Sequence, residues 1–336
     1  AREPRRAAAS RCDSLPSPPE PVSAVLTLPP SLDDVSFEQV IAQLAEVPAG
    51  ARVLVDARHV RWASPYGLTA LLALAQSRAV RPGFAPPEAE ETVSYWGRTG
   101  FFRHAESLYD FGRPVPRARA SGESSVLLEI TPVGEAGDVH HVVERIQERS
   151  AAILHDALGL EARATIGFSM TLSEACQNIV EHAGCGGWVA VQTYTWKRRL
   201  GRRVAVIAVC DAGVGFRRSL ESNRVRAAGG LGDRWDDGQA LEQAVLRGVS
   251  RFTERGRGQG LAGVRRFVTK WGGKLSVRSG TARIGLVPAW DDDVPLAEGL
   301  PPFPGAQVQI TIPAAAPAPG APGRAAAPAV ERLELL

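Results

Sequence analysis

The chain has 336 residues, a formal net charge of +3 and 44% hydrophobic residues, which are ordinary values for a globular protein. At about 150 residues per domain, this length predicts two domains and excludes neither an enzyme nor a binding protein. The small net charge gives no electrostatic footprint of nucleic-acid binding. No apolar run approaches the roughly 18 residues of a membrane helix, and the arginine-rich start lacks the core of a secretory signal. We therefore expect a cytoplasmic protein that binds neither membranes nor nucleic acid directly.

Three segments lack the large apolar side chains that a packed core requires. Residues 1–22 and 313–336 are dominated by Ala, Pro, Arg and Gly, so burial would not offset the entropy of ordering them. Residues 111–124 combine Pro, Gly, Ser and Arg without apolar periodicity, as linkers do. The sequence therefore predicts two disordered tails, a small domain over 23–110 and a larger domain over 125–312.

The first domain alternates strand-like and helix-like signals. Residues 53–55 form a short apolar run, and leucines then recur at helical spacing over 68–74. Ser64 followed by Pro65 is the typical N-cap and first position of a helix. This order predicts a small α/β unit.

The second domain combines helices with strands that pair as hairpins. A strand over 126–130 precedes a helix after Asp138 and a second helix over about 165–183. Two strands over 188–196 and 203–210 are predicted to form a hairpin. A long Gly- and Arg-rich segment over 216–260 and a helix over 261–271 follow, and then two further strands over 274–277 and 307–312. This order predicts an α+β sandwich with a mixed sheet rather than repeated βαβ units.

Three polar residues lie in line along the second of these helices. Glu174, Asn178 and His182 are spaced i, i+4 and i+8, on a face away from the apolar residues. A carboxylate there can activate a nucleophile, an amide oxygen can ligate Mg²⁺, and an imidazole can position a phosphate. The alternative is a solvated polar face, which is the rule for amphipathic helices.

Two glycine-rich segments have the composition of a nucleotide site. Asp211 ends a strand and is followed by Gly213 and Gly215, so a carboxylate could accept a hydrogen bond from an exocyclic amine while glycines let a flat ring approach. An ordinary β-turn would use the same residues. Further on, a Gly-x-Gly-x-Gly-Leu run leads into an amphipathic helix: Gly256, Gly258, Gly260 and Leu261. Its bare backbone amides would bind phosphates, and the alternative is a flexible connector.

The order and spacing of these motifs resemble the N, G1, G2 and G3 boxes of the GHKL superfamily, which includes gyrase-type, chaperone, histidine-kinase and mismatch-repair ATPases. The last box begins at Gly305. The first box, Glu-Ala-x-x-Asn-x-x-x-His-Ala from Glu174, most resembles that of the anti-sigma-factor serine kinases. Their fold is an α/β sandwich of the Bergerat type, and it binds ATP with Mg²⁺.

This resemblance implies a role for each matching residue. Glu174 would be the general base, Asn178 the Mg²⁺ ligand and Asp211 the carboxylate that recognises adenine. The remaining ATP-binding residues would be His182, Gly213, Gly215, Gly256, Arg257, Gly258, Gly260, Leu261 and Gly305. One departure from the family is Ala306, because a threonine with a hydroxyl for an adenine-bound water usually follows this glycine.

The first domain resembles the STAS domains of anti-sigma antagonists over residues 54–71. In that family a serine just before the helix accepts phosphate from a GHKL kinase. The usual acceptor positions here hold Pro65 and Tyr66, and Ser64 is better explained as a helix N-cap than as a shifted acceptor. The resemblance therefore implies a degenerate STAS-like domain.

Two functions remain open at this point. In the first, the protein is a serine/threonine kinase that uses Mg-ATP to phosphorylate a partner protein, with Glu174 as the base. In the second, the nucleotide only sets a conformation and the protein sequesters a sigma factor or a STAS-type antagonist. Retention of Glu174 favours the kinase, and Pro65 and Ala306 favour the binding module. The oligomeric state is open, with a homodimer among the options.

Overall fold

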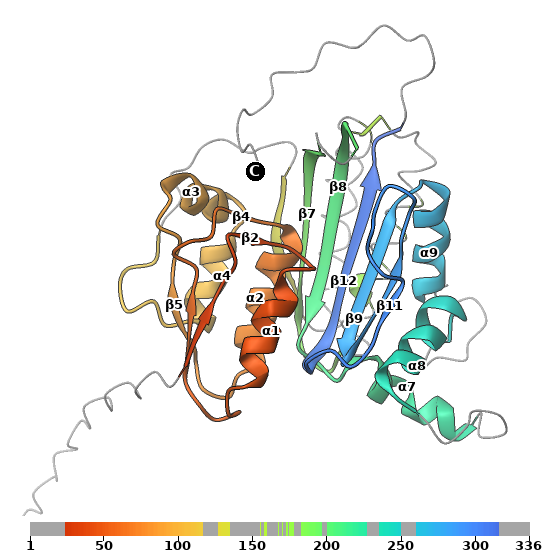
Figure 1. Cartoon of the computed structure of the whole chain (residues 1–336), viewed down its shortest axis with the longest axis horizontal. Helices are drawn as coiled ribbons and strands as arrows, with labels where there is room; N and C mark the ends of the chain where they lie inside the picture. Colours follow the sequence, from red (N-terminus) through yellow and green to blue (C-terminus); the bar gives the residue numbers. More distant parts are fainter. Residues whose placement is uncertain are drawn as a thin grey trace, which may run out of the picture.

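The structure is a computed structural model, and it describes residues 24–116, 127–134, 183–196, 200–226, 235–249 and 260–315, with a few isolated positions between 155 and 177. A small parallel sheet and its helices lie beside a seven-stranded sheet, whose other face carries a second group of helices (Figure 1). The mixed α/β class predicted from the sequence is confirmed. No described helix has the length and apolar character needed to cross a membrane.

The N-terminal unit is built on three parallel strands in the order β1-β3-β5. Its elements, in chain order, are β1 (Ala24–Thr27), β2 (Ser31–Leu32), α1 (Phe37–Ala45), β3 (Val53–Asp56), β4 (Trp62–Ala63), α2 (Pro65–Gln76), β5 (Gly83–Ala85), α3 (Glu90–Arg98) and α4 (Phe101–Leu108). The predicted strand at 53–55 and the helix that follows Ser64 are both present.

Helix α2 is capped as the sequence predicts and is buried on all sides. The backbone N–H of Gly67 donates to Ser64 Oγ at 3.1 Å, and Pro65 occupies the first turn. Every residue from Pro65 to Ala75 is buried. A helix that is apolar all round must be covered all round, and α2 lies between its own small sheet and the large one (Figure 1).

The large sheet has the strand order β11-β10-β9-β12-β8-β7-β6. Its strands and the helices between them are β6 (Leu127–Val133), β7 (Gly187–Trp196), β8 (Arg202–Asp211), α7 (Gly215–Arg226), α8 (Asp237–Leu241), the π-helical turn η3 (Glu242–Leu246), α9 (Gly260–Lys270), β9 (Lys274–Gly280), β10 (Ala282–Leu286), β11 (Leu296–Ala297) and β12 (Phe303–Pro313). The predicted β7–β8 hairpin is confirmed.

The large sheet is antiparallel at every described pairing, where the sequence predicted a mixed sheet. The difference arises because β8 and β9 run in the same direction but do not pair, since β12 lies between them and is antiparallel to both. Strand β10 was not predicted. It forms a tight hairpin with β9, and the chain then returns through β11 so that β12 enters between β9 and β8. The parallel pairs are found in the N-terminal unit instead.

Alternating side chains of the large sheet belong to two different cores. Val209, Val308 and Val277 face the helices α7–α9 and pack in one core. Ala208 and Cys210, which alternate with Val209 along β8, pack in a second core together with the N-terminal unit. The N-terminal unit and the large sheet therefore share one apolar core.

The segment predicted as a long Gly- and Arg-rich stretch contains an anchored helix. Ala240, Leu241 and Val245 are buried in the same core as the large sheet. Asp237, at the start of α8, accepts hydrogen bonds from the N–H and hydroxyl of Thr281, each at 2.9 Å. Residues 235–249 are thus fixed to the β9–β10 turn, whereas 227–234 and 250–259 lie outside the described residues.

A buried ionic cluster fixes the β10–β11 connection onto the sheet. Lys274 Nζ lies 3.0 Å from Asp291 Oδ1 and 2.9 Å from Asp293 Oδ2, and the side chain of Lys274 is 5% exposed. Arg283 also binds Asp293 with two nitrogens, at 2.9 and 2.8 Å. Burial alone would lower the pKa of Lys274, but Asp34, Asp293 and Asp291 raise it overall.

We predict that Lys274→Met destabilises the protein by about 3 kcal/mol, because it leaves buried carboxylates without their cation. The matched control is Lys270→Met on α9, where the lysine is exposed and its substitution should change stability by no more than about 0.5 kcal/mol. Urea denaturation of the two variants measures the difference, and equal losses would contradict a structural role for this cluster.

Candidate functional site

Asp211 ends strand β8 as a buried carboxylate, with 3% of the residue exposed. Its Oδ1 accepts hydrogen bonds from the N–H of Gly213 at 2.8 Å and the N–H of Ala306 at 3.3 Å. Within the described part of the chain, no group bonds its Oδ2. One oxygen is thus held by the protein while the other is available to a ligand.

Burial raises the pKa of Asp211 to about 6, against the two backbone hydrogen bonds that lower it. At pH 7 the carboxylate is therefore mostly ionised, although it lies in an apolar environment. Such a group accepts a hydrogen bond strongly, because the ligand replaces the water that burial removed.

Three glycines surround this carboxylate at positions where a side chain would not fit. A Cβ on Gly213 would lie 2.1 Å from the carbonyl oxygen of Ala183, and one on Gly305 would lie 2.2 Å from that of Asp211. Gly215 and Gly305 also have positive φ, at 74° and 79°. We call these three residues the glycine cradle: each packs closely against other protein atoms, and their predicted contact with a nucleotide stays a prediction.

Two polar residues that the sequence did not single out complete the cradle. Ser279 Oγ donates to the carbonyl of Gly305 at 2.8 Å and accepts from the N–H of Phe216 at 3.1 Å. Gln307 Nε2 donates to the carbonyl of Asp211 at 3.0 Å. Their positions follow from the pairing of β9, β12 and β8, and no local sequence motif marks them.

Asp211 and Gly215 of the cradle line a pocket that holds about 460 Å³ when the open solvent space at its mouth is included. Most of the lining is apolar, and it comes from four separate parts of the chain: Ala175, Ala183, Val209, Asp211, Gly215, Phe216, Ser219, Leu261, Ala306 and Val308. A mostly apolar lining with a few polar groups is typical of a small-molecule site.

The structure brings together the predicted site residues that it describes. Asp211, Gly215 and Leu261 line the same pocket, and Gly260 opens helix α9 beside Leu261. The other predicted site residues, Glu174, Asn178, His182, Gly256, Arg257 and Gly258, lie outside the described residues, and their roles stay predictions. Among the residues that are described, no group of three His, Cys, Asp or Glu side chains could hold a metal ion.

Residues 165–316 match the model of the family described as histidine kinase-, DNA gyrase B-, and HSP90-like ATPase. They are a GHKL-type ATPase domain. The match covers a little under half of the chain and includes Asp211, the glycine cradle and all pocket-lining residues. It begins after the N-terminal unit and strand β6, although β6 belongs to the same sheet. No match to the chain was found among curated proteins.

The described part of the pocket fits the adenine end of ATP, the ligand of this family. Asp211 Oδ2 offers an acceptor for an exocyclic amine. Val209, Leu261 and Val308 supply apolar surface. Ala306 also lines the pocket, so the hydroxyl that the family usually carries at this position is absent there.

We predict that Asp211→Asn abolishes ATP binding and stabilises the nucleotide-free protein. Because the folded pKa lies above that of the unfolded chain, the folded protein holds an extra proton between about pH 4 and pH 6. Wild-type stability thus falls as pH rises through this window, by up to about 3 kcal/mol, and Asn avoids the loss. Calorimetric ATP titration, with thermal unfolding of both proteins from pH 4 to 8, tests this. Tight ATP binding by the variant would disprove the adenine role.

We predict that Gly305→Ala weakens ATP binding, because its Cβ would lie 2.5 Å from Asp211 Oδ1 and displace the carboxylate. Gly299→Ala is the matched control, since Gly299 also has positive φ, at 67°, but its Cβ would meet nothing within 4 Å. Both variants should lose about 1 kcal/mol of stability from backbone strain, and Gly305→Ala should lose more because its Cβ also overlaps the backbone of Asp211. Only Gly305→Ala should change the ATP dissociation constant, and an equal change in both would contradict the cradle.

Proposed function

We propose that this protein is a serine/threonine kinase of the anti-sigma-factor type, which transfers the γ-phosphoryl group of Mg-ATP to a partner protein. The observation that supports it most strongly is the buried, half-bonded carboxylate of Asp211 within the GHKL-type match. The partner would be a STAS-type antagonist or a sigma factor, as the resemblance of the first box implies.

In this proposal the reacting groups come from the predicted boxes. Asn178 would hold Mg²⁺, which would offset charge on the phosphates, and Gly256, Arg257 and Gly258 would contact them. Glu174 takes the proton of the partner's hydroxyl while that oxygen bonds to the γ-phosphorus. The bond from the γ-phosphorus to the bridging oxygen breaks, and ADP leaves with the electron pair.

The acceptor hydroxyl belongs to another molecule in this proposal, and the position of Ser64 supports that choice. Ser64 is 3% exposed, and its Oγ already accepts from the N–H of Gly67. It begins α2, which packs on the face of β8 that carries Cys210, whereas the pocket lies on the face that carries Val209. The large sheet thus stands between Ser64 and the nucleotide pocket.

A second candidate is a binding module that holds a sigma factor or a STAS antagonist without turnover. Ala306 is the observation that favours it. This residue lines the pocket without the hydroxyl that the family usually has there, so the pocket departs from the family's ATP-binding site.

The deciding experiment is transfer of labelled γ-phosphate to a purified STAS antagonist that has an Asp-Ser-Ser-Gly loop. We predict transfer by the wild type and a loss of about 10²-fold or more in Glu174→Gln, because a general base contributes at least that much. ATP affinity should persist in this variant. Glu221→Gln, on the exposed surface of α7, is the control and should transfer normally. ATP binding without transfer to STAS or sigma-factor substrates would refute the kinase and favour sequestration.

A further inference from the structure

Three strands of the large sheet meet at the nucleotide pocket, and each brings one part of it. β8 ends at Asp211, β9 carries Ser279 and β12 carries Gly305. The Ser279 hydroxyl joins the other two parts, because it bonds both the carbonyl of Gly305 and the N–H of Phe216. Small relative movements of these strands would therefore change the shape of the adenine site.

The N-terminal unit contacts the same three strands from the opposite face of the sheet. Thr69 Oγ1 lies 3.2 Å from the Sγ of Cys210, the residue before Asp211. The ring of Phe37 packs edge-to-face on Phe303, two residues before Gly305, with 5.8 Å between ring centroids. Side chains alternate along β8, so Cys210 lies in the shared core while Asp211 lines the pocket. On β12 the register shifts between Phe303 and Ala306, and Phe303 lies in the shared core.

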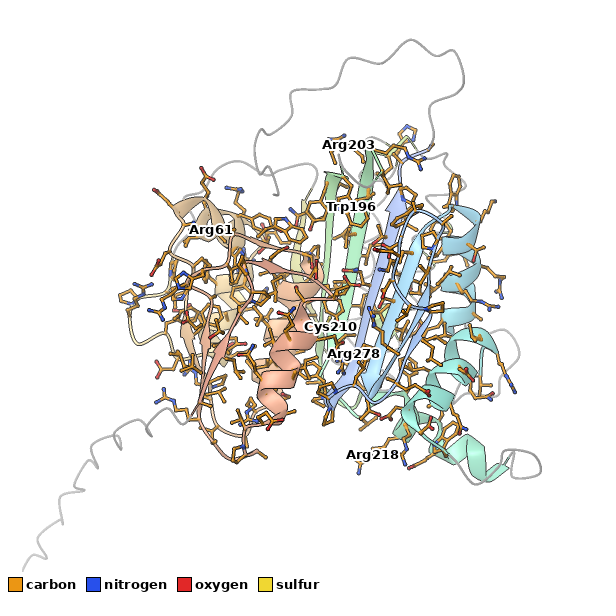
Figure 2. All side chains as sticks on the ribbon, in the orientation of Figure 1. Arg61, Trp196, Arg203, Cys210, Arg218 and Arg278 are labelled. Carbon is orange, nitrogen blue, oxygen red and sulfur yellow. The ribbon has the colours of Figure 1, made fainter. Side chains whose placement is uncertain are left out.

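The contact between the N-terminal unit and β9 is the strongest of the three. Arg278 is fully buried, and its Nε and a terminal nitrogen bind Glu38 of helix α1 at 2.7 and 3.2 Å. It also donates to the carbonyls of Gly280 and Pro301, at 3.1 and 2.6 Å. Figure 2 shows Arg278 and Cys210 in the region between the N-terminal unit and the large sheet. A two-point pair between Arg and carboxylate fixes orientation as well as distance.

We propose that the N-terminal unit, residues 24–116, is a built-in regulator of ATP affinity that acts through Glu38, Arg278 and Ser279. Glu38 holds Arg278, and so fixes the end of β9 where Ser279 ties together the two glycine turns around Asp211. Glu38 and Ser279 are then positioning residues. A partner or modification that loosens the unit would weaken ATP binding, and ATP would in turn tighten the unit. This inference rests on ATP binding as part of the proposed function, but not on phosphate transfer.

The chain offers an internal control for this proposal. Arg103 of α4 pairs with Glu129 of β6 at 3.0 Å, so this ion pair also joins the N-terminal unit to the large sheet. Its side chains are 66% and 41% exposed, and β6 lies at the far edge of the sheet from β9. Loss of this pair removes a similar charge contact without touching a strand of the pocket.

The test is a double-mutant cycle on the full chain, read as the ATP dissociation constant. We expect Glu38→Gln and Ser279→Ala each to weaken binding by roughly tenfold, within the usual range of coupling between sites. The double variant should bind about as weakly as either single variant, because both act on one path. Glu129→Gln should bind as the wild type does. Additive losses, or an unchanged constant in Glu38→Gln, would overturn the proposal.

A second readout does not require ATP and separates positioning from simple stability. Hydrogen exchange of the Phe216 amide in the nucleotide-free protein should speed up in Glu38→Gln and not in Glu129→Gln, because Ser279 accepts from that amide. If Glu38→Gln does not fold, Glu38→Asp keeps the charge but shortens the reach, and it should show the same faster exchange. Unchanged exchange at Phe216 in Glu38→Gln would overturn the proposal. Failure of the wild type to bind ATP would overturn both this proposal and the proposed function, whereas ATP binding without phosphate transfer would count against the kinase alone.

Discussion

The site depends on one buried carboxylate that the fold keeps partly unsatisfied. Asp211 carries a pKa near 6 because it is removed from water, and the backbone bonds to it reach only one of its oxygens. Ionisation at neutral pH therefore costs folding free energy that a bound amine would return. Such a cost is typical of functional positions, where stability is given up for binding. The N–H of Gly213 and the close approach of Gly305 hold this group in place.

The large sheet is covered on both faces, so it connects the N-terminal unit with the pocket. Its front face carries the apolar side chains under α7–α9, and its back face carries Cys210, Gln307 and Arg278 under the N-terminal unit. Few polar groups can be buried in this way without partners, and Arg278 meets four acceptor contacts. The pocket and the N-terminal unit are consequently separated by the thickness of one sheet.

The sequence predicted the local features of the fold and of the site well. The Ser64–Pro65 helix start, the β7–β8 hairpin and the Asp211–Gly213–Gly215 turn each rest on short-range rules of capping, alternation and glycine geometry. Ser279 and the Glu38–Arg278 pair could not be predicted, because the partners lie 26 or more residues apart and only strand register brings them together. Helix α8 and β10 were missed because Arg, Asp and Gly around them hide short apolar runs.

Helix α2 serves two hydrophobic surfaces at once, and this has a consequence for how the protein unfolds and evolves. A helix buried from Pro65 to Ala75 has no solvent face on which substitutions are neutral. The N-terminal unit and the ATPase domain are therefore expected to melt together in a single cooperative transition rather than as two modules. A recombination event that exchanged either part alone would leave an apolar surface without its match. We therefore expect the N-terminal unit and the ATPase domain to be inherited together and to accumulate substitutions together.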